Sequence, residues 1–459
     1  MSTPILQASP EEINTPEKRG KYTVSIIERE QAGILPAVTF ADAGFKVICV
    51  DTDQTVVNNL AKGRASSLET ETENKLKNHV KVGRMTATDD IKKAVSQSDL
   101  IAISIPVRID AKKKPDYSDI EKACKRIGSC LRRGSLVLVI NLTGIGVTEH
   151  LIKETLENTS GLKVGNDFGL AYSPFHTLNG ETVETARDYS EIVAATDKNS
   201  LNAASTVLEA IMKKGIVKTR NTKTAEVTAL FEMLRQDTDA AVVNELALFC
   251  EKTGVDLLEV RRLAEAHGNA LFLGPVSPNG SVREGSYLLL EDAENLNVKL
   301  RIPSTAREVN EEIVKHAANL AKDALRNCGK TLRRAKISIL GISQTPNAKG
   351  SPKKLVEEIA AILEARGAKV TLYDPHLKEY ENSENQARVK KTLAESLEGS
   401  DCAIVLTGHD QFKRLNLRKL KHVMKMPAAI IDFEGILDAG KIEKEGFIYR
   451  GRGRGIWTK

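Results

Sequence analysis

The sequence is poor in aromatic residues and in long apolar runs. Phe, Trp and Tyr make up only 4% of its 459 residues, and the net charge of +6 comes from Lys and Arg interspersed with acids. Nucleic-acid-binding proteins need clustered basic residues, so this class of function is disfavoured. No apolar run reaches the roughly 18 residues that a membrane-spanning helix requires, and we expect no membrane span.

Cysteine and histidine are also scarce, with six and eight residues respectively. The cysteines form no CxxC pair and the histidines show no ligand spacing, so neither disulfides nor a metal site are expected. The first twenty residues are polar and lack the apolar centre of a secretion signal. We therefore expect a cytoplasmic protein with free thiols and a disordered tail over residues 1–20.

Short apolar strands alternate with helices over residues 21–215. A strand, turn, helix and second strand occupy residues 22–53, and the apolar runs DLIAISIP and SLVLVINL continue the pattern. Continuous apolar strands separated by helices are typical of a doubly wound parallel sheet. The same alternation returns over residues 329–459, which predicts a second domain of this kind.

The segment between them, residues 216–328, has helical periodicity. A long helix is predicted to end at Gly254, and another is predicted over residues 303–327. Between these helices the stretch GPVSPNGSVREGS favours a loop. The predicted fold class is α/β, with two Rossmann-like doubly wound parallel-sheet domains joined by a central helical domain that contains a long helix.

Several phrases carry a resemblance that runs from about residue 21 to the end. They include FADAGFKVICVDTD, AEVTALFEMLRQDTDAAVVNELALFCEKTG and SDCAIVLTGHDQF. On these the chain resembles the UDP-glucose/GDP-mannose dehydrogenase family, most closely its archaeal members acting on N-acetylated UDP-sugars. The resemblance implies NAD on the first α/β domain, a UDP-sugar on the last, and dimerisation through the central helices. It also implies oxidation of the sugar's primary alcohol to a carboxylate, for polysaccharide biosynthesis.

The dinucleotide turn departs from the family pattern. The glycines of a GxGxxG motif would fall on residues 28, 30 and 33, but only Gly33 is present, beside Glu28 and Glu30. Each glutamate adds a side chain where close approach is needed, and a charge that costs roughly 3 kcal/mol at ~5 Å from a phosphate. Asp51 stands where an acid would hold a ribose, although a solvated loop aspartate fits equally well. NAD is the only cofactor implied, and its usual binding mode is disfavoured.

The positions that the family uses for chemistry are also changed. The family's nucleophilic cysteine, general-base lysine, oxyanion-binding asparagine and active-site glutamate are replaced by Ser281, Ala229, Met233 and Phe175. Neither Ala229 nor Met233 can accept a proton or donate to an oxyanion, and both suit a helix that packs in a core. Gly285 replaces an aspartate near Ser281, which leaves this serine without an activating base.

Other substitutions affect both halves of the implied ligand site. Asn141–Leu142 replace a Ser–Thr pair, and Gln344–Thr345 and Glu434 replace an aromatic–Lys pair and an arginine in the nucleotide half. Some residues persist: Thr148 and Glu149, which with Gly33 and Asp51 are the remaining candidates for binding a cofactor, and Asp237, Asn244 and Glu245, which suit a helix surface or an interface.

Three functions are compatible with this pattern. The first is a non-catalytic homologue that forms a homo-oligomer, or a hetero-oligomer with an active relative. The second is an NAD-dependent UDP-sugar dehydrogenase, of the UDP-N-acetylmannosamine type, with a rearranged site. The third is a different chemistry or a binding role in the same cleft. The candidate residues of this third function are His176, Ser281, Arg283 and Glu284.

Overall fold

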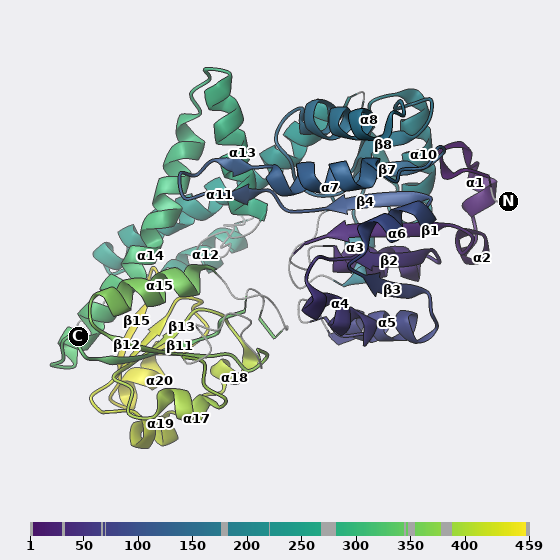
Figure 1. Cartoon of the computed structure of the whole chain (residues 1–459). Coiled ribbons are helices and arrows are strands. Elements are labelled where there is room, and N and C mark those ends of the chain that lie inside the picture. The colour runs from purple at the N-terminus through teal and green to yellow at the C-terminus, as the bar shows by residue number, and fades with distance from the viewer. Residues whose placement is uncertain are drawn as a thin grey trace. The chain divides into compact units, whose positions relative to one another are not determined.

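The structure is a computed structural model that describes residues 3–29, 33–65, 68, 70–175, 182–219, 221–267, 281–343, 346–347, 354–377 and 388–455. The chain divides into two compact units, whose helices and strands are labelled in Figure 1. Unit 1 comprises Met1–Leu234 and Glu284–Lys299, and unit 2 comprises Arg235–Arg283 and Leu300–Lys459.

Unit 1 is built on an eight-stranded sheet with the order β10-β9-β8-β7-β4-β1-β2-β3. All neighbouring strands run parallel except β8 and β9. The central strands are buried along their whole length, which is why they appear in the sequence as continuous apolar runs. The strands are β1 (Thr23–Glu28), β2 (Lys46–Val50), β3 (Met85–Thr88), β4 (Leu100–Ser104), β7 (Leu136–Val139), β8 (Gly169–Tyr172), β9 (Glu191–Ala195) and β10 (Ile216–Lys218).

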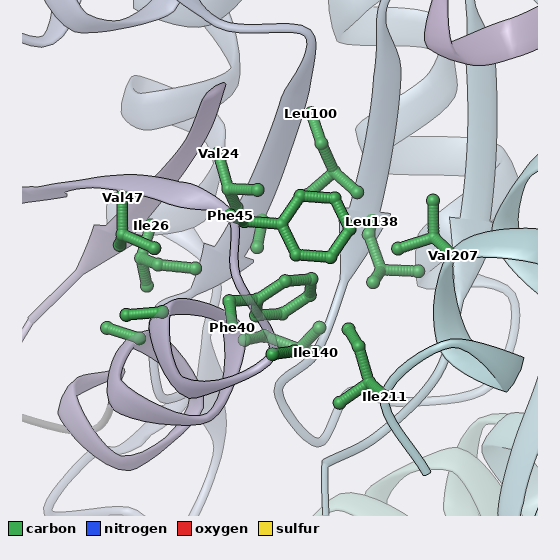
Figure 2. Packing of buried hydrophobic residues seen from close by; sticks show 14 of the residues in the cluster. Val24, Ile26, Phe40, Phe45, Val47, Leu100, Leu138, Ile140, Val207 and Ile211 are labelled. Atoms are coloured by element: carbon green, nitrogen blue, oxygen red, sulfur yellow. The ribbon is translucent and has the colours of Figure 1, made fainter. Parts of the chain in front are cut away.

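Helices cover this sheet and close its core. The rings of Phe40 and Phe45 meet edge to face with their centroids 5.8 Å apart, and Figure 2 shows them among other side chains of the hydrophobic core, including Leu138 and Ile140. The helices are α3 (Ile34–Asp42), α4 (Gln54–Ala61), α5 (Thr70–Lys81), α6 (Ile91–Gln97), α7 (Ser118–Gly128), η2 (Thr148–Lys153), α8 (Glu154–Ser160), α9 (Val183–Arg187) and α10 (Lys198–Glu209). A short hairpin pairs β5 (Arg108–Ile109) with β6 (Pro115–Asp116).

The predicted disordered tail over residues 1–20 is wrong for residues 3–20. They form η1 (Ile5–Gln7), α1 (Pro10–Ile13) and α2 (Pro16–Arg19), and the side chains of Ile5 and Ile13 are buried. The buried guanidinium of Arg19 donates hydrogen bonds to the carbonyls of Ile13 and Ala43. The prediction failed because the overall composition of the segment is polar, and composition does not indicate these few buried contacts.

We expect Ile13→Ala to lower the free energy of unfolding of unit 1 by about 2–4 kcal/mol, because it leaves a cavity under α1. Urea denaturation followed by circular dichroism measures this loss. Glu11→Ala, which changes an exposed side chain on the same helix, is the control and should have little effect. Equal stability of both variants and the parent would mean that the segment does not dock.

The helices predicted for a central domain are shared between the two units. The helix α11 (Thr222–Thr253) begins in unit 1 and ends in unit 2 at Gly254, whose φ of +75° permits the left-handed end of the helix. The predicted helix over residues 303–327 is confirmed as α14 (Arg301–Asn327), and α12 (Leu257–Ala266) precedes it. The division at residues 216 and 328 stays a prediction. Within the described residues, no helix is long and apolar enough to cross a membrane.

The predicted loop GPVSPNGSVREGS is only partly testable, because residues 268–280 lie outside the described part. From Ser281 on the loop prediction is wrong, since α13 spans Ser281–Asn295. Val282 and Ser286 are buried on this helix. Tertiary packing therefore overrides the weak helix propensity of Gly and Ser here.

Unit 2 contains a five-stranded parallel sheet with the order β12-β11-β13-β14-β15. This confirms the second Rossmann-like sheet. Its hydrophobic core includes residues of α14 and α15. The strands are β11 (Lys336–Leu340), β12 (Lys369–Tyr373), β13 (Cys402–Val405), β14 (Ala429–Asp432) and β15 (Ile448–Gly451), and the helices are α15 (Lys354–Ala365), α17 (Leu393–Leu397), α18 (Asp410–Lys413), α19 (Leu417–Val423) and α20 (Ala439–Lys444).

Candidate functional site

The turn after β1 is where a doubly wound sheet would receive a dinucleotide. Glu28 is the last residue of β1, and Gly33 directly precedes α3. The Glu28 side chain turns onto this helix end, and its Oε2 accepts a hydrogen bond of 2.9 Å from the Gly33 amide. Amides at a helix N-terminus are the groups that bind phosphates. One of them is here occupied by a carboxyl group of the chain itself. Glu30 lies outside the described residues.

Gly33 has a packing role in this turn. A Cβ atom at Gly33 would lie 2.6 Å from Ile26 Cγ2 and 2.9 Å from Glu28 Cβ. Only a glycine therefore lets α3 approach β1 so closely. The persistence of Gly33 is explained by contact between helix and strand, without a ligand.

Asp51 is buried beside Glu28, so the alternative of a solvated loop residue is wrong. Each of the two residues is 3% exposed. Burial, and then the nearby charge of Asp51, raise the pKa of Glu28 to about 8, although the Gly33 amide opposes the shift. Burial also raises the pKa of Asp51, whose Oδ1 accepts a hydrogen bond of 2.8 Å from the Asp53 amide.

Thr148 and Glu149 are engaged by α11. The amides of Gly146 and Thr148 donate to the carboxylate of Glu226 at 2.6 and 3.0 Å. The hydroxyl of Thr222 donates to Glu149 at 2.9 Å. Burial raises the pKa of Glu226. Glu226 was not predicted from the sequence. Its position one turn before Ala229 on the predicted long helix could have indicated that it faces the same site.

The positions of the implied general base and oxyanion donor lie in an apolar contact. Ala229 and Met233 of α11 are 2% and 6% exposed. A Cβ atom at Gly285 of α13 would lie 2.8 Å from Met233 Cβ and 2.9 Å from Leu142 Cδ2. Met233 and Leu142 therefore fill the space that a side chain at position 285 would need. We call Met233, Leu142 and Gly285 the apolar plug.

Phe175 belongs to the hydrophobic core of unit 1. It is 7% exposed, and its ring lies 6.4 Å from that of Phe40. The position of the family's active-site glutamate is therefore used for packing. The structure adds no support for the third function, a different chemistry or a binding role in the same cleft. His176 and the side chain of Ser281 lie outside the described residues. Arg283 forms an ion pair with Glu358, with a nitrogen–oxygen distance of 3.6 Å.

The persisting residues Asp237 and Asn244 are buried in unit 2, so placing them on a helix surface is wrong, whereas Glu245 is exposed. Asp237 accepts hydrogen bonds from Arg307 at 2.6 Å and from Asn310 at 2.8 Å, and Asn244 donates to Asn310 at 2.8 Å. This network holds α11 against α14. Its partners Arg307 and Asn310, three residues apart in AREVN, were not predicted.

The corresponding turn of unit 2, after β11, is held by a buried acid as well. Oδ2 of Asp374 accepts hydrogen bonds from the amides of Ile342 and Ser343 at 2.7 and 2.8 Å. His409 Nε2 lies 3.1 Å from the same oxygen, and its Nδ1 accepts from the Asn347 amide at 3.0 Å. Since Nδ1 is an acceptor, the proton of the neutral ring is on Nε2 and points to Asp374. Burial opposes the change, but hydrogen bonds from His409 and these amides hold the pKa of Asp374 well below its usual range. Gln344 and Thr345 lie outside the described residues.

We expect His409→Ala to destabilise unit 2 by roughly 3 kcal/mol, because the Asn347 amide loses its partner and the buried Asp374 carboxylate loses the hydrogen bond from His409. Urea denaturation and faster hydrogen exchange at Asn347 should both report the change. His422→Ala, at an exposed histidine of α19, is the matched control. Equal exchange at Asn347 in parent and variant would refute the role of His409 in this turn.

Comparison with known proteins agrees with both sheets. Three models of the UDP-glucose/GDP-mannose dehydrogenase family match the chain: the NAD binding domain over residues 23–216, the central domain over 223–312 and the UDP binding domain over 339–439. The UDP-N-acetyl-D-mannosamine dehydrogenase of Pyrococcus horikoshii is 28% identical over 94% of this chain and 99% of its own length. The UDP-glucose 6-dehydrogenase of Rhizobium meliloti is 25% identical over 94% and 99%.

Solved structures give the same result. The structure of the Pyrococcus horikoshii UDP-D-ManNAc dehydrogenase superimposes with a TM-score of 0.82 at 25% identity, covering 94% of this chain and 99% of that one. An NDP-N-acetyl-D-galactosaminuronic acid dehydrogenase from Methanosarcina mazei Go1 gives 0.74 at 25% identity, covering 99% and 98%.

Proposed function

Because this chain belongs to the UDP-glucose/GDP-mannose dehydrogenase family, a family of nucleotide-sugar dehydrogenases, we propose that it is a non-catalytic member. It keeps the fold of its relatives and acts as a homologue or partner subunit, without oxidising a sugar nucleotide. Its place in the cytoplasm, where thiols stay reduced, is part of the proposal and is supported by six free cysteines.

The observation that carries this proposal is the apolar plug. Alcohol oxidation needs a base within hydrogen-bond reach of the substrate and donors aimed at the developing oxyanion. Ala229 and Met233 supply neither, and Met233 occupies the space beside Gly285. The replacements fit one another sterically, as expected of a site that has been repacked as core.

The turn after β1 supports the same conclusion for NAD. The implied cofactor needs free amides and close approach of its diphosphate. Glu28 occupies the Gly33 amide and places a carboxyl group there. The residues present do not fit a dinucleotide in the usual mode, so we assign no reaction step to NAD.

The test is an assay of the purified full-length protein with NAD and either UDP-N-acetylmannosamine or UDP-glucose, following NADH fluorescence. We expect no NADH above the no-enzyme rate, while the Pyrococcus horikoshii relative assayed alongside should turn over. Formation of NADH and a sugar acid would reject the proposal. It would establish the second candidate, an active UDP-sugar dehydrogenase with a rearranged site, which the near-complete coverage of its relatives favours. Calorimetric titration of this protein with the UDP-sugar distinguishes two roles for a non-catalytic member. Binding would indicate a subunit that holds a sugar nucleotide, and no binding would indicate one that acts through protein contacts.

An exposed apolar surface of unit 2 supports an oligomer. Val242, Leu246 and Phe249 recur at helical spacing on α11 and are 50%, 36% and 65% exposed. We place the subunit interface on this surface, with a second copy or an active relative as its partner.

Phe249→Asp should convert the oligomer to a monomer, because it places a charge at the most exposed of these three apolar side chains. Light scattering coupled to gel filtration measures the mass. Val82→Asp, the same change at a separate exposed apolar residue of unit 1, should leave the oligomer intact. A monomeric parent protein would reject this placement.

A further inference from the structure

Cations are concentrated on the segment of unit 2 that carries α18 and α19. Acids and bases are interspersed over the chain as a whole, but residues 411–431 contain no Asp or Glu. Six Lys and Arg side chains of this segment are exposed. We call them the basic surface: Lys413, Arg414, Arg418, Lys419, Lys421 and Lys425.

The basic surface has a firm support. Phe412 of α18 is fully buried and Leu420 of α19 is 8% exposed. Both belong to the hydrophobic core on the face of the unit 2 sheet opposite α14 and α15 (Figure 1). Asn416 caps α19, because its Oδ1 accepts a hydrogen bond of 3.1 Å from the Lys419 amide. The folded protein therefore holds these cations close together despite their mutual repulsion.

Few acids balance this charge. Lys413 pairs with Asp410 at 2.8 Å, and Arg418 and Lys421 share Glu445 at 3.6 and 3.3 Å. Within the described part of the chain, no ion pair is formed by Arg414, Lys419 and Lys425. The six cations exceed the two acids by four charges, on a chain whose net charge is +6. Such a concentration of one sign of charge favours a partner of the opposite sign.

The composition of the segment narrows the chemistry of this partner. The Leu, Val, Met and Phe side chains of residues 411–426 are buried or half-buried. Protein interfaces have apolar and aromatic side chains at their centre and are depleted in Lys, whereas four of these six cations are lysines. A second protein is therefore disfavoured as the partner.

Nucleic acid is disfavoured for a different reason. Single strands are bound by stacking of bases on exposed aromatic rings, and duplex backbones are also bound by hydroxyl side chains. Residues 411–426 contain no Ser, Thr, Tyr or Trp, and their one aromatic ring, that of Phe412, is buried. A lipid bilayer requires neither kind of group, because anionic headgroups diffuse in the membrane plane and gather beneath clustered cations.

We propose that the basic surface of α18 and α19 binds the anionic surface of a lipid membrane by electrostatic attraction. The apolar side chains of the segment are engaged in the core of unit 2, so the protein lies on the membrane without inserting into it. This inference goes beyond the proposed function and does not depend on whether the chain oxidises a sugar nucleotide.

The test is sedimentation of the purified full-length protein with lipid vesicles. We expect it to sediment with vesicles made of equal amounts of phosphatidylcholine and phosphatidylglycerol, and to stay in solution with vesicles of phosphatidylcholine alone. Raising the salt concentration from about 0.1 M to about 0.5 M should release the protein, because salt screens exposed charges.

Two matched variants locate the binding surface. Lys419→Gln combined with Lys425→Gln should weaken binding to the anionic vesicles about tenfold. Lys46→Gln combined with Lys62→Gln removes the same charge at two exposed lysines of unit 1 and should leave binding unchanged. Circular dichroism confirms that each variant is folded before it is mixed with vesicles.

Three results would overturn the inference: no sedimentation with the anionic vesicles, equal sedimentation with both kinds of vesicle, or equal binding by the two variants. Retention of a labelled DNA duplex at protein concentrations that leave the anionic vesicles unbound would overturn it as well, and would assign the basic surface to nucleic acid. The NADH assay is independent of these results. Production of a sugar acid would reject the proposed function and leave membrane binding in place.

Discussion

Gly285→Ala should destabilise unit 1 by about 2 kcal/mol, although alanine normally favours a helix. The added Cβ would lie 2.8 Å from Met233 Cβ and 2.9 Å from Leu142 Cδ2, so neighbours from two segments must move. We expect this overpacking to cost about 3 kcal/mol, and the better helix propensity of alanine to return about 1 kcal/mol. Urea denaturation followed by circular dichroism measures the net change.

A double-mutant cycle tests whether crowding in the apolar plug causes the destabilisation by Gly285→Ala. Met233→Ala alone should cost about 3 kcal/mol through a cavity, and the double variant should be more stable than the sum of the single changes predicts by about 2 kcal/mol. Gly440→Ala is the control for helix propensity, because the nearest atom to its added Cβ is 3.5 Å away, and it should stabilise the protein slightly. If the changes in the free energy of unfolding at positions 233 and 285 are additive, the two side chains do not compete for the same space.

The stability of unit 1 should fall as the pH rises from about 4.5 to about 8. Glu28 keeps its proton in the folded state up to a pKa of about 8, while the unfolded chain releases it near the ordinary value of 4.5. The folded state therefore binds more protons over this window, and raising the pH favours unfolding. The full shift corresponds to roughly 5 kcal/mol at ~1.4 kcal/mol per pH unit.

Glu28→Gln isolates this contribution. The glutamine can still accept the hydrogen bond from Gly33 but does not titrate, so its stability should depend less on pH and exceed that of the parent protein by roughly 4 kcal/mol at pH 8. Asp51 has a raised pKa too and acts in the same direction in both proteins. Urea denaturation at several pH values gives both curves, with Asp90→Asn as the surface control. Parallel curves for the parent protein and Glu28→Gln would show that Glu28 is ionised in the folded state.

The fold was predictable where burial leaves a continuous pattern. The run over residues 100–104 is buried on both faces, so it shows as a strand without further context. The short strand β8 contains a glycine, Gly169, and was missed. The prediction of a disordered N-terminal tail failed because the composition of this segment is polar. Its ordered structure depends on a few contacts, such as those of Arg19, that composition does not reveal.

The sequence predicted which catalytic side chains are missing, but it did not predict the contacts that the replacing side chains make. Residue identity alone showed that Ala229 and Met233 cannot perform the family's chemistry. That Met233 meets Gly285 depends on two helices that are far apart in the sequence, so no local pattern contained it. The same holds for Glu28. Its charge predicted repulsion of a phosphate, but its hydrogen bond to Gly33 depends on the close approach of β1 and α3.

Two carboxyl groups change how the protein's abundance responds to metabolism: Glu28, which holds the turn after β1, and Asp374, which follows β12 and holds the turn after β11. An enzyme that is stabilised by a bound cofactor gains stability as the free cofactor concentration rises, and loses it when the cofactor is depleted. Here each turn is occupied by a side chain that cannot dissociate. The protein's amount in the cell should therefore stay constant when the NAD pool fluctuates, while the amounts of relatives that NAD stabilises follow that pool.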